Sequence, residues 1–251
     1  GVKEITTDEK GQWYLNGKHI FLRGMRYISS LWMSEANEEM WKADFTKMLD
    51  MDINAIRIGS HVERDGLYTM CDEMGLLMWQ VFPLHYCISD SDDVMNRACD
   101  MIRDMGMMLT NHACMGMWSV YKEPEIYSLP DKPNVYFKLC EILKETLGSV
   151  DPVRWIHKGD YREGVQNIMI GSCQDGDLDV HTAQIQPNIV EFGSDSVPCL
   201  ESLKKFIPED KLWPPHWDTW QYWGLFYYNQ FRRAKVEMGN SLEEFIHNTQ
   251  E

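Results

Sequence analysis

The sequence lacks several features that would assign it at once to a large class of proteins. No stretch approaches the roughly 18 consecutive apolar residues of a membrane-spanning helix, and no signal-like apolar segment stands near the N-terminus. Basic residues are scarce, since 24 Lys and Arg stand against 39 Asp and Glu, for a net charge of −15. Because an acidic surface repels nucleic acids and anionic membranes, we expect neither as a partner.

Motifs for metals and cofactors are also missing. The seven cysteines form no C-x-x-C pair, no H-E-x-x-H occurs, and no G-x-G-x-x-G follows the first predicted strand. We therefore expect no metal and no cofactor. The odd number of cysteines and their apolar neighbours favour reduced, buried thiols and a reducing compartment such as the cytoplasm. A metal-dependent barrel hydrolase stays a rival interpretation, because four histidines fall near predicted strand ends: His61, His85, His157 and His181.

What the chain does contain is a regular alternation of strand-like and helix-like segments. Helical periodicity covers 38–51, 63–74, 91–110 and 133–147, and short apolar runs typical of buried strands occupy 53–58, 76–82, 114–121, 154–158, 165–170 and 188–192. A hairpin around Asn16-Gly17 precedes them, and its second strand is expected to continue through about Tyr27. Alternation of this kind predicts an α/β protein with a parallel sheet, which we expect to close into a (β/α)₈ TIM barrel.

The C-terminal part fits this pattern less well. About seven strands can be identified rather than eight, so the last strand of the barrel is expected to be incomplete or atypical. The segment 200–251 is predicted to be helical and aromatic, with a helix that begins at Ser241. In the helix 91–110, a stripe of Met101, Met105 and Met108 is predicted to face the core.

Two carboxylates stand where separate apolar strands end. The strand before Lys122-Glu123-Pro124 stops at Glu123, and the strand Ile189-Val190 stops at Glu191. Active sites of parallel barrels lie at the carboxyl ends of their strands, so the two side chains can face one pocket. A pair of carboxyl groups is the minimum requirement for hydrolysis of a glycosidic bond.

Taken together, these segments resemble the catalytic barrel of glycoside hydrolase family 2, the group of β-galactosidases, β-glucuronidases and β-mannosidases. The resemblance runs from about Tyr14 to Gly193 and is carried by Tyr14–Gly24, Asn54–Arg57, Cys71–Leu76 with Trp79, Asn111-His112, Trp118–Pro124 and Glu191–Gly193.

The resemblance implies roles for individual residues. Glu123 would be the general acid/base and Glu191 the nucleophile of a retaining β-glycoside hydrolase that acts on a carbohydrate substrate. Family members carry β-sandwich domains before and after the barrel. We therefore expect residues 1–12 to be the remnant of a domain junction and 13–251 to be the catalytic barrel, cut from a longer multidomain protein. A homo-oligomer is compatible with the aromatic C-terminal segment.

Three positions depart from the family pattern. Lys122 stands where family members usually have Asn, Arg26 where many have Asn, and Val81 where Asp or Glu is frequent. Lysine cannot copy the two-sided hydrogen bonding of an amide, and a nearby ammonium favours an ionised carboxylate. The site could therefore be that of an ordinary glycosidase with relaxed contacts to the sugar. It could also accept an anionic sugar, bind sugar without hydrolysis, or support an altered chemistry in which Lys122 takes part.

Further side chains are candidates for sugar binding beside Lys122 and Arg26. Arg57 and His61 follow or end the second barrel strand, and the family has similar residues there. Trp79 and Trp118 are candidate stacking platforms, although packing is the commoner role of such aromatic side chains.

Overall fold

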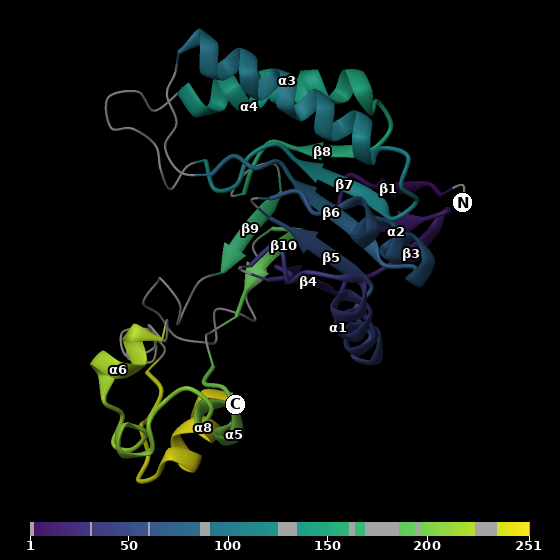
Figure 1. Ribbon diagram of the computed structural model, residues 1–251. Coiled ribbons are helices and arrows are strands. Elements are labelled where there is room, and N and C mark those ends of the chain that lie inside the picture. The colour runs from purple at the N-terminus through teal and green to yellow at the C-terminus, as the bar shows by residue number, and fades with distance from the viewer. Residues whose placement is uncertain are drawn as a thin grey trace. The chain divides into compact units, whose positions relative to one another are not determined.

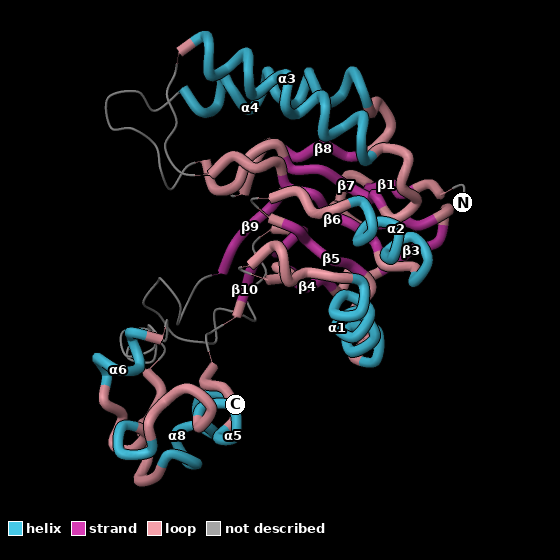
Figure 2. Tube along the Cα trace, viewed as in Figure 1, coloured by secondary structure: helices cyan, strands magenta, loops and turns pink. Residues whose placement is uncertain are grey.

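The computed structural model describes residues 3–30, 32–59, 61–85, 91–124, 135–160, 164–168, 186–193, 196–223 and 235–250 (Figures 1 and 2). The chain divides into two compact units, one of Gly1–Gln166 with Gln186–Val190 and one of Asn167–Ile185 with Glu191–Glu251. Among the described residues, no helix combines the length and the apolar character needed to cross a bilayer.

The first unit opens with a three-stranded antiparallel sheet in the order β1 (Ile5–Thr7), β2 (Trp13–Leu15), β3 (Lys18–Ile20). The predicted hairpin is confirmed: Leu15 pairs with Lys18, and the two turn residues have φ angles of 51° and 75°, as a tight primed turn requires.

The expectation of one strand from this hairpin to Tyr27 is wrong, because β3 ends at Ile20 and a separate strand begins at Gly24. Between them the chain changes sheets. The side-chain amide of Asn54 holds this connection, since its Oδ1 accepts from the Arg23 N–H at 2.9 Å and its Nδ2 donates to the Phe21 carbonyl at 2.9 Å.

A parallel sheet of five strands forms the body of the first unit (Figure 1). Its strands follow one another in chain order, and one helix lies in the chain between each strand and the next. The elements are β4 (Gly24–Tyr27), α1 (Glu38–Asp50), β5 (Ala55–Ile58), α2 (Asp65–Met74), β6 (Leu77–Val81), α3 (Asp92–Leu109), β7 (Met115–Ser119), α4 (Val135–Val150) and β8 (Trp155–His157). A two-stranded sheet of β9 (Val165–Ile168) and β10 (Asn188–Phe192) follows.

Both faces of the parallel sheet are covered, as expected for strands of this kind. One face packs against the helices, and its cluster joins Ile56, Ile58, Met78, Trp118 and Ile156 to helix residues such as Phe45, Leu67, Ile102 and Leu143. The opposite face, here called the inner face, forms a second cluster of Ala55, Leu77, Trp79, Val81 and Met117, which Ile5 and Trp13 of the N-terminal sheet complete. The N-terminal sheet therefore packs against the inner face.

A bulge in β7 decides which side chains reach which face. Met78 pairs with Met115, whereas the next residue of β6, Trp79, pairs with Met117, so β7 has one extra residue at Gly116. Met115 accordingly lies in the helix-facing cluster and Met117 in the inner cluster, although residues two apart in a regular strand share a face. The bulge sets the orientation of the residues of β7 that follow.

The helices begin and end where their sequences indicate. The Asn37 side chain accepts from the Met40 N–H at 2.9 Å at the start of α1, and α2 stops at Gly75, whose φ of 78° is left-handed. The predicted methionine stripe of α3 is wrong in part: Met105 is buried, but Met101 is 57% and Met108 50% exposed. The buried stripe runs through Ala98, Ile102, Met105 and Leu109, so the other two methionines lie on its flank.

The second unit has its own small core. Its helices are α5 (Leu200–Leu203), the 3₁₀ helix η2 (Glu209–Lys211), α6 (Trp217–Tyr222) and α8 (Leu242–Gln250), packed around Leu203, Leu212, Trp220, Phe245 and Ile246. The predicted helix at Ser241 is confirmed, because the Ser241 hydroxyl accepts from the Glu244 N–H at 3.1 Å. Trp220 belongs to this core, and its indole N–H donates to the Lys211 carbonyl.

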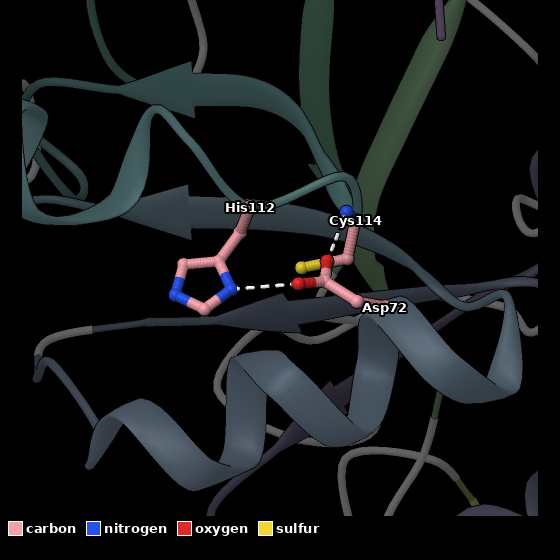
Figure 3. Close-up of side chains that lie close together, drawn as sticks. All are labelled: Asp72, His112 and Cys114. Atoms are coloured by element: carbon pink, nitrogen blue, oxygen red, sulfur yellow. Dashed lines mark hydrogen bonds and ion pairs between the residues drawn. The ribbon is translucent and has the colours of Figure 1, made fainter. Parts of the chain in front are cut away.

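A polar clamp ties α2 to the chain that leads into β7 (Figure 3). One carboxylate oxygen of Asp72 lies 2.8 Å from Nδ1 of His112, and the other accepts from the Cys114 N–H. The His112 ring also packs on Tyr68 of α2, with ring centroids 5.5 Å apart. Burial opposes ionisation of Asp72, but the hydrogen bonds from His112 and Cys114 outweigh it and lower the pKa of this carboxyl.

We predict that Asp72→Ala lowers the free energy of unfolding by about 1–3 kcal/mol at neutral pH, because the Cys114 N–H and the His112 ring lose their acceptor. A carboxyl whose pKa is lowered in the folded state stabilises it above the unfolded pKa, and that stability is lost as the pH falls through the folded value. The difference in the free energy of unfolding between the wild-type protein and Asp72→Asn should therefore become smaller below about pH 4.

Urea unfolding at several pH values measures both effects. Glu73→Ala is the matched control, because Glu73 is the neighbouring carboxylate of α2 and is exposed; it should change stability by less than about 0.5 kcal/mol. Equal losses for the two alanine variants would contradict the clamp.

Candidate active site

The candidate site lies at the carboxyl ends of the parallel strands, where barrel proteins place their ligands. Beyond the last residue of β7 the chain stays buried through Pro124. The Val120 N–H donates to the His157 carbonyl at 2.9 Å on one side, and the Lys122 N–H donates to the Leu84 carbonyl at 3.0 Å on the other. This extension of β7 is therefore held between the chain that follows β6 and the last residue of β8.

Glu123 ends this extension and is only 5% exposed. Its φ of 50° lies in the left-handed region, which costs a residue with a side chain about 1–3 kcal/mol. Pro124 packs on Gly159 so closely that a Cβ at that glycine would lie 2.7 Å from the proline ring. The backbone on both sides of Glu123 is thus fixed, and with it the direction in which the carboxylate leaves the chain.

His85 contacts this carboxylate. Its Nε2 lies 3.1 Å from Oε2 of Glu123. The main chain around Pro83 turns tightly, with the Leu84 N–H donating to the Phe82 carbonyl at 2.6 Å, and this turn precedes the histidine. The sequence indicated His85 only as a possible metal ligand. It did not predict the contact between His85 and Glu123.

Lys122 and Arg57 are both buried, although both are cations. Lys122 is 4% exposed beside Glu123 in the chain. Arg57, in β5, donates to Oδ1 of Asp160 at 2.7 Å, and its guanidinium lies 5.8 Å from the centre of the Trp79 ring. Asp160 was missed by the sequence analysis, although it follows β8 in the same way that Glu123 follows β7.

The two predicted tryptophan platforms lie on opposite faces of the sheet. Trp79 is on the inner face, where its indole N–H donates to the Ser119 hydroxyl at 2.8 Å and its ring meets Trp155 edge-on. Trp118 points to the helices, donates to Asp151 at 2.8 Å and is 0% exposed. The expected role of Trp118 as a sugar contact is corrected, because the bulge at Gly116 turns it away from the inner face.

His61 and Arg26 lie after β5 and within β4. Nε2 of His61 is 3.0 Å from a carboxylate oxygen of Glu63, which also accepts from the Ser29 hydroxyl. Arg26 is exposed and reaches towards the end of β5, since a Cβ at Gly59 would lie 3.7 Å from its Nε.

Glu191 is half-buried in β10. The start of this strand is fixed in the first unit, because the Trp13 indole N–H donates to Oδ1 of Asn188 at 2.7 Å. Glu191 and Phe192 themselves belong to the second unit. The pairing of Glu191 with Glu123 therefore stays a prediction.

Metal chemistry has one candidate cluster among the described residues, the clamp of Asp72, His112 and Cys114, whose ligand atoms lie within 4.8 Å of one another (Figure 3). Burial raises the pKa of the Cys114 thiol far above its usual range, which disfavours the thiolate that binds metals. Both carboxylate oxygens of Asp72 already accept hydrogen bonds. This donor set fits a structural clamp better than a metal site.

The histidines of the rival metal interpretation have separate partners. His61 contacts Glu63, His85 contacts Glu123, and His157 lies 3.4 Å from the Ser119 hydroxyl, while His181, like Cys87 and Cys173, lies outside the described residues. Among the described cysteines, Cys71, Cys114 and Cys140 are buried, Cys99 is half-buried and Cys199 is exposed.

Comparison with known proteins places these observations in a family. Residues 6–182 match the family described as glycosyl hydrolases family 2, TIM barrel domain. The chain is 28% identical over 115 residues to the β-mannosidase of Capra hircus, an alignment that covers 44% of this chain and 13% of that protein.

Solved structures show the same fold. The β-D-mannosidase of Dictyoglomus thermophilum superposes with a TM-score of 0.82 at 18% identity, over 100% of this chain and 35% of that one. The β-glucuronidase of Parabacteroides merdae gives a TM-score of 0.62 at 21% identity, over 78% of this chain and 27% of that one. This chain thus spans about a third or less of the length of these relatives.

The predicted (β/α)₈ TIM-barrel fold and the predicted family are both confirmed: the chain belongs to glycosyl hydrolases family 2, as part of its TIM barrel domain.

Proposed function

We propose that the protein is a retaining β-glycoside hydrolase in which Glu123 is the general acid/base and Glu191 the nucleophile. The observation that carries this proposal is the position of Glu123, a buried carboxylate fixed in a left-handed conformation at the carboxyl end of a strand in a family 2 barrel. Carbohydrate is the substrate class that this family implies.

In the proposed reaction the carboxyl group of Glu123 protonates the glycosidic oxygen while the carboxylate of Glu191 attacks the anomeric carbon. The bond from that carbon to the leaving oxygen breaks, and a glycosyl ester of Glu191 forms. Glu123, now ionised, then removes a proton from water, which attacks the anomeric carbon and releases Glu191. This sequence requires the two carboxyl groups to lie about 5–5.5 Å apart.

The surroundings of Glu123 suit such a role. Its carboxylate has a histidine at one oxygen, and the inner face carries the buried Arg57–Asp160 ion pair beside Trp79. These groups are held by hydrogen bonds or by main-chain contacts before any substrate arrives. Groups that are oriented in advance lower the reorganisation that the reaction requires.

Lys122 and Arg26 bear on which sugar the site would accept. It is buried next to Glu123, and Arg26 lies at the carboxyl end of β4, so two cations belong to the loops and strand ends of the candidate site. These cations support an anionic sugar, such as a uronic acid, as the substrate. The same lysine is also compatible with an alternative function, in which the barrel binds sugar without hydrolysing it.

We predict that Glu123→Gln lowers kcat/KM for phenyl β-glycosides by on the order of 10²–10⁴, because the amide cannot deliver a proton. Glu191→Gln should remove turnover, since no ester can form. A 2-deoxy-2-fluoro β-glycosyl fluoride should add one glycosyl group to Glu191, detected by peptide mass. Glu73→Gln on α2 is the control and should turn over at the wild-type rate. Sugar binding without turnover by the wild-type protein, or labelling of another residue, would contradict the proposal.

We further predict that aryl β-uronides are hydrolysed faster than the corresponding neutral β-glycosides, and that Lys122→Gln narrows the difference. The reason is the attraction between the sugar carboxylate and the cations at positions 122 and 26. Initial rates on matched 4-nitrophenyl substrates measure the preference. Comparable or faster turnover of the neutral sugars would rule out the anionic substrate while leaving the hydrolase intact.

A further inference from the structure

His85 contacts the carboxylate of the proposed acid/base, Glu123. Its Nε2 lies 3.1 Å from Oε2 of Glu123, and both side chains are mostly buried. We infer that His85 is a positioning residue that fixes the carboxyl group of Glu123 for proton transfer, an inference that rests on the role proposed for Glu123.

The main chain brings the two residues together independently of their side chains. His85 follows β6 and Glu123 follows β7, and these neighbouring segments are joined by two main-chain hydrogen bonds. The Phe82 N–H donates to the Ser119 carbonyl at 2.8 Å, and the Lys122 N–H donates to the Leu84 carbonyl at 3.0 Å. The residues immediately after Leu84 and Lys122 are His85 and Glu123 themselves. Their contact is therefore a consequence of the register in which the strand extensions pair.

A hydrogen bond at one oxygen has a defined effect on a carboxyl group. The group rotates about the bond to its carbon chain, and the contact at Oε2 fixes that rotation. With Nε2 of His85 donating to Oε2, the proton destined for the substrate is carried by Oε1.

The proton transfers of the two steps balance. In the first step the proton passes from Oε1 to the glycosidic oxygen, which takes the electron pair of the bond that breaks. In the second step water returns a proton to Oε1. The hydrogen on Nε2 of His85 stays in place throughout, so the histidine acts only through Glu123.

This role has a kinetic signature that loss of packing lacks. A 2,4-dinitrophenol leaving group departs without protonation, whereas phenol needs the general acid. A variant in which Glu123 is misplaced should therefore lose kcat/KM on the phenyl glycoside and keep it on the dinitrophenyl glycoside. A variant whose fold is loosened should lose activity on both.

We predict that His85→Leu lowers kcat/KM for phenyl β-glycosides by on the order of 10- to 100-fold. On the 2,4-dinitrophenyl β-glycosides of the same sugar it should change kcat/KM by less than about threefold. His85→Gln should restore most of the loss, because its amide can place an N–H near the position of Nε2. Glu123→Ala should show the same preference for the good leaving group, more strongly.

The outcomes separate the two proposals. Equal losses on both substrates for His85→Leu, or no rescue by His85→Gln in a protein that melts at the wild-type temperature, would overturn the role of His85. If His85→Leu does not fold, His85→Ala takes its place in the same comparison, and equal losses on both substrates in a folded His85→Ala protein would overturn the role. Absence of any leaving-group dependence in Glu123→Ala would instead overturn the assignment of Glu123.

Discussion

The candidate site depends on the way in which the chain beyond β7 stays paired after the strand itself has ended. The Val120 N–H donates to His157, the last residue of β8, and the Lys122 N–H donates to Leu84 in the segment after β6, so alternate residues of one extension are tied to opposite neighbours. A net contribution of about 0.5–1.5 kcal/mol for each such bond is comparable to the 1–3 kcal/mol that a left-handed glutamate costs. Glu123 can hold its conformation because its neighbours have no freedom to relax it.

The inner face of the sheet carries a buried ion pair. Arg57 and Asp160 form this pair beside Trp79. Removing one member of a buried pair costs about 3–5 kcal/mol, yet apolar replacements of the whole pair are often neutral or stabilising. The pair therefore need not stabilise the fold. Its better explanation is that it orients polar side chains at the carboxyl ends of the strands, where barrel proteins bind their ligands.

Local signals explain which parts of the fold were predictable. The Asn-Gly hairpin and the helix start at Ser241 each follow from the conformational needs of a few adjacent residues. The face of Trp118 could not be predicted in this way. A single extra residue at Gly116 exchanges the faces to which the following side chains of β7 point. The sequence alone does not indicate whether a glycine inside an apolar run forms a bulge.

The same distinction applies to the site. Glu123 could be found because a charged residue that ends an apolar strand is visible in one segment, and Glu191 was proposed on the same ground. The contacts of His85 and Asp160 depend on how separate segments pair, and no single segment carries that information. His85 shows the point most clearly: its distance to Glu123 follows from the register between the extensions of β6 and β7. A shift of one residue in that register would turn each side chain of an extension to the opposite face, so the contact exists only because the bulge and the turn at Pro83 set the two extensions in phase.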